Sequence, residues 1–286
     1  MPQNRATLAA FSRYTKLFRG RSMRAVLAVL LLWFTGVPLF ASECPGNPDA
    51  LGTSRTLAVS PTEYPRVGSM QYGQTLPLED HEVVLTFDDG PLSPYTSRVL
   101  DILKAQCVQA TFFIIGQMAD SYPSLLRRIH DEGHSIGTHT QDHRLKLRSV
   151  ERMKREIDEG IESVGRALGN RLEVAPFFRF PGLIHPVPAE DYLASKRIMV
   201  WSADLVADDW RRVSADQVLK RALIRLEKRG RGILLLHDIQ RRTTLALPRL
   251  LATLKAQNYH VVHVVPAASG EPQVTPAPTT IKAGAP

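Results

Sequence analysis

The stretch Val-Val-Leu-Thr-Phe-Asp-Asp-Gly-Pro, at residues 83–91, carries the two features that decide the fold assignment. Its first five residues form a largely apolar, β-prone run, which is typical of a strand buried on both faces of a parallel sheet. Asp88 and Asp89 follow directly, and two carboxylates at the end of a buried strand cost free energy unless something binds them. The stretch therefore predicts a buried strand that leads into a functional site, with an ordinary acidic Gly-Pro turn as the alternative.

Six more apolar, β-rich runs follow the first, and stretches with a helical period of apolar residues separate them. The strand-like runs cover residues 110–115, 135–138, 177–180, 199–203, 233–236 and 261–265. The helical stretches cover residues 95–106, 121–132, 147–168, 214–229 and 244–257. Buried strands that alternate with amphipathic helices indicate an α/β fold with a parallel sheet. Seven strands with helices on one side favour a closed or nearly closed barrel, whose site lies at the carboxyl ends of the strands.

The charge of the chain is unevenly distributed. Lys and Arg number 36 against 28 Asp and Glu, a net charge of +8, and six of these charges lie in residues 1–41, which contain no acid. The apolar run Ala25–Phe40 within this segment and the small residues Ala41 and Ser42 that end it are typical of a secretory signal peptide, with Met23 as an alternative start. The run is shorter than the roughly 20 residues of a membrane-spanning helix, so an uncleaved anchor is the alternative and no stable span is expected. The net charge of about +2 on the rest of the chain gives no reason to expect a nucleic-acid partner.

Two further segments lie outside the alternation of strands and helices. Residues 42–80 contain many Gly, Pro and Thr residues and are expected to form an extended leader, and residues 267–286 have the composition of a flexible Pro/Ala-rich tail. The chain has two cysteines, which exclude a disulfide-rich scaffold and a four-cysteine zinc site. In an exported protein Cys44 and Cys107 are expected to form a disulfide that fastens the leader, with two free thiols as the alternative.

Two histidines follow the third strand-like run. His139 and His143 are four residues apart, and on a helical turn this spacing would direct both imidazoles the same way. Together with Asp89 they offer two nitrogen ligands and one oxygen ligand, which leaves coordination positions open and is typical of catalytic zinc. Non-haem iron has compatible ligands, and a pair of surface or capping histidines is the alternative.

Other charged residues lie at the ends of the remaining strands. His237 ends the run 233–236, where an imidazole is placed for general acid catalysis, with a structural histidine as the alternative. Arg179 lies at the end of the run 177–180 and offers a guanidinium to orient a carboxylate. The acidic residues that follow the run 199–203 are Asp204, Asp208 and Asp209. Because the strands of a parallel barrel end at the same rim, these side chains are expected to converge.

Three motifs occur in order along the chain: Thr-Phe-Asp-Asp-Gly-Pro at 86–91, His-Thr-x-x-His at 139–143 and Leu-Leu-His-Asp at 235–238. In this combination the chain resembles the polysaccharide deacetylases of carbohydrate esterase family 4, the NodB-homology domain, over residues 82–266. The resemblance implies an α/β fold that is a distorted (β/α)7 barrel over residues 81–266, with an N-terminal extension. It also implies the roles of six residues: Asp88 as the catalytic base, Arg179 as the residue that holds this base, His237 as the general acid, and Asp89, His139 and His143 as the ligands of a divalent metal. The metal expected is Zn²⁺, with Co²⁺ or another divalent ion as the alternative.

The chain departs from the pattern of this family in two motifs. The third motif usually has the sequence Arg-x-Pro-Tyr-Gly, whereas residues 179–183 are Arg-Phe-Pro-Gly-Leu. Gly182 therefore offers only its backbone N–H to an oxyanion, and one wall of the sugar site beside Pro181 is altered. The fourth motif is two residues longer than the usual Asp-x-x-Asp-Trp, so Asp204, Asp208 and Asp209 are all candidates for the acidic partner of His237. Asp204 fits best because it follows Trp201 and Ser202, and Trp201 is expected at the substrate site.

The resemblance implies an exported, metal-dependent hydrolase that removes N-acetyl groups from N-acetylglucosamine-containing glycans and releases acetate. Chitooligosaccharide, peptidoglycan and exopolysaccharide all carry this acetamide, and the sequence does not choose among them. Two alternatives are a non-catalytic glycan-binding relative and a hydrolase of the same barrel superfamily that acts on the C–N bonds of small amides. The expected compartment is the periplasm or the cell exterior.

Overall fold

The structure is a computed structural model that describes residues 44–144 and 149–268. The predicted signal peptide at 1–41 and residues 269–286 of the predicted tail lie outside the described residues. None of the helices within the two described ranges is long and apolar enough to cross a membrane.

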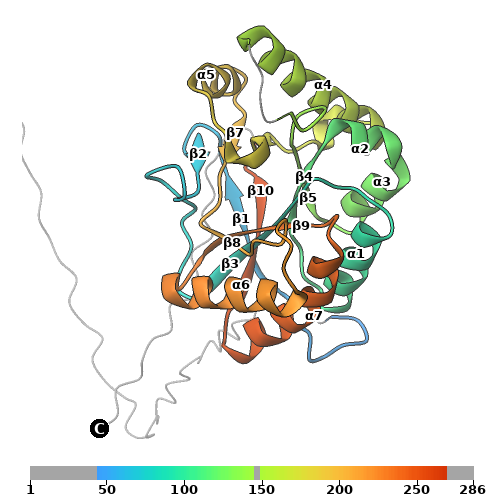
Figure 1. Cartoon of the computed structure of the whole chain (residues 1–286), viewed down its shortest axis with the longest axis vertical. Helices are drawn as coiled ribbons and strands as arrows, with labels where there is room; N and C mark the ends of the chain where they lie inside the picture. Colours follow the sequence, from blue (N-terminus) through green and yellow to red (C-terminus); the bar gives the residue numbers. More distant parts are fainter. Residues whose placement is uncertain (1–43, 145–148, 269–286) are drawn as a thin grey trace, which may run out of the picture. The chain divides into compact units, whose positions relative to one another are not determined.

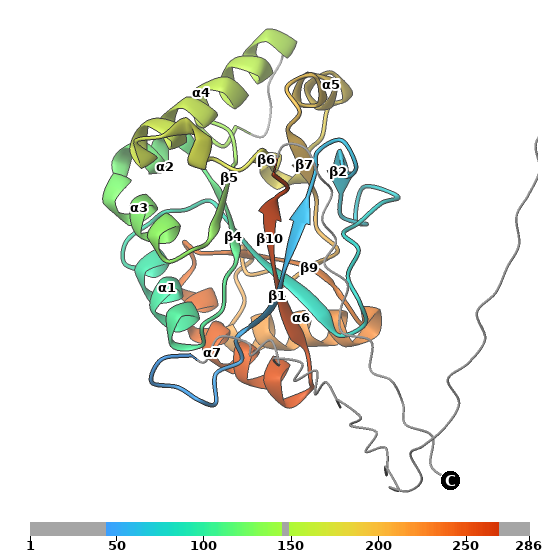
Figure 2. The ribbon, with the colours of Figure 1, turned by 180° about the vertical axis from the view of Figure 1, so that it is seen from behind.

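Ten strands, each parallel to the strands it pairs with, form one sheet within the described residues (Figure 1). The strands are β1 (Thr53–Val59), β2 (Arg66–Val67), β3 (Glu82–Asp88), β4 (Thr111–Ile114), β5 (Ser135–Thr138), β6 (Phe177–Phe178), β7 (Met199–Trp201), β8 (Leu205–Val206), β9 (Gly232–His237) and β10 (His260–Pro266). The helices are α1 (Tyr95–Ala105), α2 (Gly116–Ser121), α3 (Pro123–Asp131), α4 (Val150–Leu168), α5 (Val187–Ser195), α6 (Ala215–Arg229) and α7 (Arg241–Ala256). In both views α1 to α4 lie along one side of the strands, and α6 and α7 lie below them (Figures 1 and 2).

Strand β3, which contains residues 83–88 of the stretch Val-Val-Leu-Thr-Phe-Asp-Asp-Gly-Pro, pairs with three other strands. It pairs with β9 from Val83 to Asp88 and with β4 from Thr86 to Asp88, while its first two residues pair with β10. From β4 the sheet continues through β5, β6 and β7 to β2, and β8 pairs with the far side of β9. The predicted α/β fold with a parallel sheet is confirmed, and all seven predicted strand-like runs form strands.

The two-residue period of β3 divides its side chains between two hydrophobic cores. Val83, Leu85 and Phe87 belong to the core between the sheet and the helices, whereas Val84 lies with Phe113 in a second core. The second core also receives side chains from β1, β6, β7, β9 and β10, so it fills the interior of the barrel. Asp88 lies an even number of residues from Val84, so it is on the interior side, at the carboxyl end of the strand.

Helix ends follow local sequence signals. The hydroxyl of Ser214 accepts from the backbone N–H of Gln217, whose side chain in turn accepts from the N–H of Ser214, and this capping box begins α6 where it was predicted. Gly230 ends α6 in the left-handed conformation, with φ of 80°. The hydroxyl of Ser149 accepts from the N–H of Arg152 at the start of α4, and the predicted helix over 147–168 is confirmed from residue 150 onward.

The leader contributes strands that the sequence analysis did not predict. Strand β1 pairs along its length with β10, beside which it lies in Figure 2, and β2 pairs with β7. The predicted disulfide is present: Cys44 and Cys107 are bonded, with their Cα atoms 5.6 Å apart, which joins the start of the leader to the end of α1. Helix α2 and the two-residue strand β8 were also missed, because segments this short carry too few residues to show a period. Helix α5 was missed because its apolar residues do not gather on one face.

Candidate active site

The carboxyl ends of β3, β5 and β9, with the segments that follow them, surround a cavity of about 590 Å³. Asp88, Asp89, His139, His143 and His237 all line this cavity, so the structure brings together the predicted residues of three motifs. The apolar or neutral residues that complete the lining include Met70, Gln71, Gly182, Leu183, Trp210 and Leu235. The convergence follows from the register, because each strand places its last inward-facing residue at the same rim.

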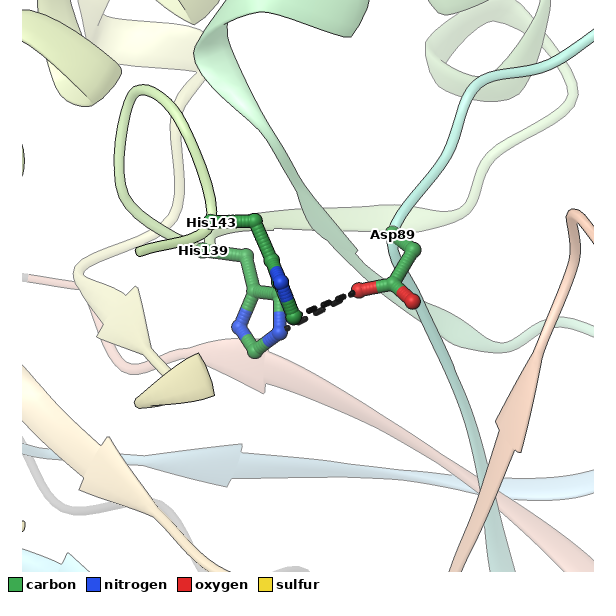
Figure 3. A group of neighbouring side chains, drawn as sticks. All are labelled: Asp89, His139 and His143. Atoms are coloured by element: carbon green, nitrogen blue, oxygen red, sulfur yellow. Dashed lines mark ion pairs between the residues drawn. The ribbon is translucent and has the colours of Figure 1, made fainter. Parts of the chain in front are cut away.

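Asp89, His139 and His143 form a compact group of potential metal ligands (Figure 3). The Oδ1 atom of Asp89 lies 3.4 Å from Nε2 of His139 and 3.2 Å from Nε2 of His143, and Figure 3 shows both imidazoles directed toward this carboxylate. The Nδ1–H of His139 donates to the carbonyl oxygen of Arg179 at 2.7 Å. Because a carbonyl can only accept, Nδ1 of His139 carries the hydrogen of this bond, and Nε2, which faces Asp89, is the nitrogen that can bind a metal in the neutral imidazole.

The donor set of this group fits a divalent cation. Oδ1 of Asp89 is buried and has no hydrogen-bond partner among the described residues, although it lies between two imidazole nitrogens. Burial opposes ionisation of Asp89, but contacts with His139 and His143 outweigh it and hold the pKa of this carboxyl well below its usual range. One ionised carboxylate and two imidazoles are the ligands that catalytic zinc takes while keeping positions open for water and substrate.

The backbone that places the two histidines differs from the prediction. Residues 139–144 form a loop after β5 and not a helical turn. Thr140 and His143 both adopt positive φ, at 66° and 55°, and the hydroxyl of Thr140 accepts from the N–H of His143 at 3.1 Å. The two imidazoles therefore meet through a turn of irregular backbone, and the spacing rule pointed to the right pair for the wrong geometric reason.

Asp88 and Arg179 form a buried ion pair beside the metal ligands. One guanidinium nitrogen of Arg179, Nη1, donates to Oδ1 of Asp88 at 2.7 Å and to the hydroxyl of Thr86 at 2.8 Å. The other, Nη2, donates to the carbonyl of Ser202 at 2.9 Å, and the side chain has no exposed surface. Oδ2 of Asp88 remains, at 4.0 Å from Nε2 of His139. The pair fixes one oxygen of the carboxylate and leaves the other directed to the metal site.

His237 is paired with Asp209 at the end of β9. Nδ1 of His237 donates to Oδ1 of Asp209 at 2.7 Å, while Oδ2 accepts from the backbone N–H of His237 at 2.7 Å and from the hydroxyl of Thr243 at 2.6 Å. Burial favours the neutral imidazole, but the hydrogen bond and charge of Asp209 outweigh it and raise the pKa of His237 to about 9. His237 is thus an imidazolium at neutral pH with Nε2–H facing the cleft.

Asp204, expected as the partner of His237, does not contact it. Its buried carboxylate accepts from the backbone N–H and hydroxyl of Ser69, from the hydroxyl of Thr75 and from the N–H of Ile233. Asp204 also pairs with Arg229 of α6 at 3.2 Å, and Asp208 pairs with Arg221 and Arg225 of the same helix. Asp209, which directly precedes Trp210, is therefore the acidic residue of this motif that contacts His237.

The sugar-site predictions are met only in part. Gly182 lines the cavity with a positive φ of 59°, whereas Pro181 beside it is buried. Trp201 is fully buried in the barrel interior against Phe113 and Phe177, so it cannot contact a substrate. The tryptophan at the cavity is Trp210, which is 44% exposed and packs edge-on against the ring of His237. The signal in the sequence that points to Trp210 is its position directly after Asp209, which matches the Asp-Trp pair that ends the fourth motif.

Met70 and Gln71 were missed because they belong to the leader, far from every motif. Their only sequence context is a Gly- and Pro-rich segment, which carries no pattern that points to a site. Only the pairing of the leader with the sheet brings them to the cavity.

Comparison with known proteins agrees with this geometry. Residues 76–199 match the sequence model of the polysaccharide deacetylase family. The chain is 34% identical over 185 residues to a peptidoglycan-N-acetylglucosamine deacetylase of Listeria monocytogenes. The aligned region covers 64% of this chain but only 38% of that protein. A chitooligosaccharide deacetylase of Rhizobium leguminosarum bv. trifolii is 34% identical over 161 residues, covering 56% of this chain and 73% of the relative.

Among solved structures, a peptidoglycan deacetylase of Bdellovibrio bacteriovorus superposes with a TM-score of 0.68 at 32% sequence identity, covering 75% of this chain and 59% of that one. The similarity thus includes both the sequence motifs and the arrangement of the strands that carry them. The chain belongs to the polysaccharide deacetylase family.

Proposed function

We propose that the protein is an exported, metal-dependent hydrolase that removes N-acetyl groups from N-acetylglucosamine-containing glycans and releases acetate. One observation carries the proposal: three chemically complementary units meet at a single cavity. They are the carboxylate of Asp88 held by Arg179, the ligand group around Asp89, and the imidazolium of His237. Amide hydrolysis needs a base for water, a site for the carbonyl oxygen and an acid for the leaving amine, and each unit meets one of these needs.

Asp89, His139 and His143 would hold the metal, and a divalent cation bound there polarises the acetamide carbonyl and lowers the pKa of water. Two imidazoles and one carboxylate favour Zn²⁺, with Co²⁺ as the alternative. The hydrogen bond from Nδ1–H of His139 to the carbonyl of Arg179 keeps the liganding nitrogen oriented.

Asp88 is the proposed base. Arg179 occupies its Oδ1 atom and balances its buried charge, so Oδ2 is the atom that takes the proton of the attacking water. As water adds to the carbonyl carbon, negative charge develops on the acetamide oxygen, and Gly182, which lines the cavity, is the proposed donor to it through its backbone N–H.

His237 is the proposed acid. Its Nδ1–H is bonded to Asp209, so Nε2 carries the proton that is transferred to the amine nitrogen as the C–N bond breaks. The raised pKa keeps this proton in place at neutral pH. Loss of the proton to the amine gives the free amino sugar and acetate, and Asp209 then stabilises the neutral imidazole in the tautomer that is protonated on Nδ1.

Substrate class and export have separate support. The relatives are named for peptidoglycan N-acetylglucosamine and for chitooligosaccharide, which share the N-acetylglucosamine acetamide. The predicted signal peptide and a disulfide, which persists in oxidising compartments, support export to the periplasm or the cell exterior. Residues 81–266 are the proposed catalytic domain, and the leader 42–80 completes its sheet through β1 and β2.

The test is acetate release by the purified, metal-loaded protein from N-acetylglucosamine oligomers, peptidoglycan and an acetylated exopolysaccharide, with and without a chelator. We expect acetate from at least one glycan, loss of activity on chelation and recovery on addition of Zn²⁺. Glycan binding without acetate release would make the protein a non-catalytic relative. Hydrolysis confined to small amides would make it a hydrolase of the same barrel superfamily that acts on the C–N bonds of small amides. Activity that survives complete metal removal would overturn the metal dependence.

A further inference from the structure

The cavity is larger than an acetamide group requires, and part of its wall has no acid–base chemistry. Met70 and Gln71 supply this part from the leader, outside the residues that match the family. They lie in the loop of residues 68–74, called here the leader loop, between β2 and β3. The side chain of Met70 is 49% exposed, one of the few large apolar side chains exposed to this degree in the described residues.

The leader loop is fastened to the barrel on both sides of these two residues. The N–H and hydroxyl of Ser69 both donate to Oδ1 of Asp204, at 2.9 and 2.6 Å, and the N–H of Met70 donates to the carbonyl of Ala203 at 3.0 Å. On the other side the hydroxyl of Tyr72 donates to Glu190 at 2.6 Å. Met70 and Gln71 are therefore held at the cavity by a rigid base.

The base of the leader loop is also closely fitted to the barrel. Gly68 has φ of 106°, and a Cβ atom there would lie 2.6 Å from the carbonyl carbon of Ser202. Thr75 donates its hydroxyl to Oδ2 of Asp204 at 2.7 Å, so this carboxylate binds both ends of the loop. This arrangement gives the buried carboxylate of Asp204 a role that its place in the fourth motif did not reveal.

Gln71 connects the leader loop to the proposed oxyanion segment. Its Nε2–H donates to the carbonyl of Leu183. Gly182 and Leu183 adopt positive φ of 59° and 58°, a conformation that costs a residue with a Cβ atom free energy and needs support from its surroundings. The bond from Gln71 provides such support and leaves Oε1 of Gln71 as an acceptor for a sugar hydroxyl.

We infer that the leader loop is a substrate-binding wall in which Met70 and Gln71 contact the pyranose ring next to the N-acetylglucosamine that is deacetylated, and that Asp204 positions this wall. The inference rests on the proposed function. The reacting acetamide occupies the space among Asp88, the metal ligands and His237, so the rest of the glycan must lie against the remaining lining. A thioether and a neutral amide suit the C–H face and the hydroxyls of a pyranose ring. The leader loop thus takes the place of the aromatic wall that Gly182 lacks.

The test compares wild type with Met70→Ala, Gln71→Ala and Ser69→Ala on a disaccharide and a hexasaccharide of N-acetylglucosamine. Met70→Ala and Ser69→Ala should raise the KM for the hexasaccharide about fivefold, with kcat changed less than about twofold, because the contact with the neighbouring ring is formed equally in the ground and transition states. Gln71→Ala should raise the KM similarly and also lower kcat, because it removes the hydrogen bond that supports Leu183 beside Gly182. Activity on the disaccharide should change less. Met70→Leu, which restores an apolar side chain of similar volume, should return the KM toward that of wild type.

A purely structural role would not give this pattern. Leu172→Ala is the matched control, because Leu172 is an exposed apolar residue, 92% accessible, that does not line the cavity. Its KM should equal that of wild type, and the thermal unfolding midpoints of the surface variants should agree. Asp204→Asn should raise the KM in the same way without moving the pH profile, although it also lowers stability. Unchanged KM values in Met70→Ala and Gln71→Ala would overturn the inference.

Failure of the proposed function is distinguished by a second measurement. If wild type releases no acetate, hexasaccharide affinity is measured directly by calorimetry for wild type and Met70→Ala. A weaker affinity of the variant, again by about fivefold, would support the wall even without catalysis. Equal affinity, or no binding by wild type, would refute it.

Discussion

Asp209→Asn should lower the pH at which activity is lost and slow the reaction at neutral pH. In the wild type Oδ2 of Asp209 accepts from the N–H of His237 and from the hydroxyl of Thr243, and Oδ1 accepts from Nδ1–H of His237. An asparagine amide would keep its oxygen toward the first two donors and turn its NH₂ group toward Nδ1. Nδ1 would then have to accept a hydrogen bond, and the imidazolium, which has a proton on both nitrogens, would no longer fit.

The magnitude follows from the pKa of His237. Burial lowers this pKa, and the hydrogen bond and charge of Asp209 reverse the effect and raise it from 6.5 to about 9. The difference corresponds to about 3 kcal/mol in favour of the imidazolium. Because the raised pKa keeps the acid form below pH 9, kcat/KM in the wild type falls as the pH rises through that value. Without the carboxylate, the pKa falls back toward or below its ordinary value of 6.5, and kcat at neutral pH decreases by up to about 10²-fold, because the protonated fraction falls and the contribution of general acid catalysis is lost.

The assay is acetate release from an N-acetylglucosamine oligosaccharide, measured as kcat/KM from acid to alkaline pH for wild type and variant at saturating metal. Asp204→Asn is the matched control, since Asp204 is another buried carboxylate of the same motif and forms no hydrogen bond or ion pair with His237. For Asp204→Asn, the fall of kcat/KM at alkaline pH should coincide with that of wild type. The assignment of Asp209 is wrong if Asp209→Asn leaves the alkaline limb in place, or if Asp204→Asn moves it as far.

Four further predictions concern the base, its ion pair, a buried histidine and the disulfide. Asp88→Asn should reduce kcat by about 10²–10⁴-fold while the bound metal stays stoichiometric; metal loss in this variant would show that Asp88 is a ligand. Arg179→Met leaves Asp88 buried without its partner and should lower the free energy of unfolding by about 3–5 kcal/mol, part of which Asp88→Asn in the same chain should restore. Burial lowers the pKa of His134 to about 3, so stability should fall as the pH decreases below 6.5, and His134→Asn should flatten this dependence in urea titrations; an equally steep decline would contradict it. Cys44→Ser opens a loop between residues 63 apart, ending at Cys107, and should lower the free energy of unfolding by about 4 kcal/mol, which an unchanged denaturation midpoint would disprove.

The regular part of the fold could be predicted from the sequence because it depends on local patterns. Strand β3 is buried along its whole length around an apolar run, Val83–Leu85 and Phe87, and α6 has both a capping box and a terminal glycine, so these elements were predicted within a residue or two of their observed bounds. Strand β1 could not be found this way. Only its last residues are buried, and its pairing with β10 joins segments about two hundred residues apart, which no local pattern records.

In the candidate site too, residues that follow a strand directly could be predicted, whereas contacts made by loop residues could not. Asp89, His139, His143 and His237 were placed together correctly, because the ends of parallel strands share one rim and these residues follow such strands directly. Asp204 was misassigned because the connection between β7 and α6 is irregular, and the sequence position of a carboxylate in a loop does not fix the direction of its side chain.

The sequence by itself thus predicted the parallel α/β fold, the grouping of Asp89, His139 and His143, and the position of Asp88 and His237 at the same cavity, all of which follow from residue type and strand register. Only the tertiary structure decided that Asp209 is the partner of His237, that Trp210 and not Trp201 lies at the cavity, and that Met70 and Gln71 form part of its wall. The physical reason is that these choices depend on hydrogen bonds and packing between segments distant in the chain. The buried carboxylate of Asp204 is the clearest case. Its position in the sequence is compatible with a contact to His237, but in the folded chain it accepts hydrogen bonds from Ser69 and Thr75 of the leader.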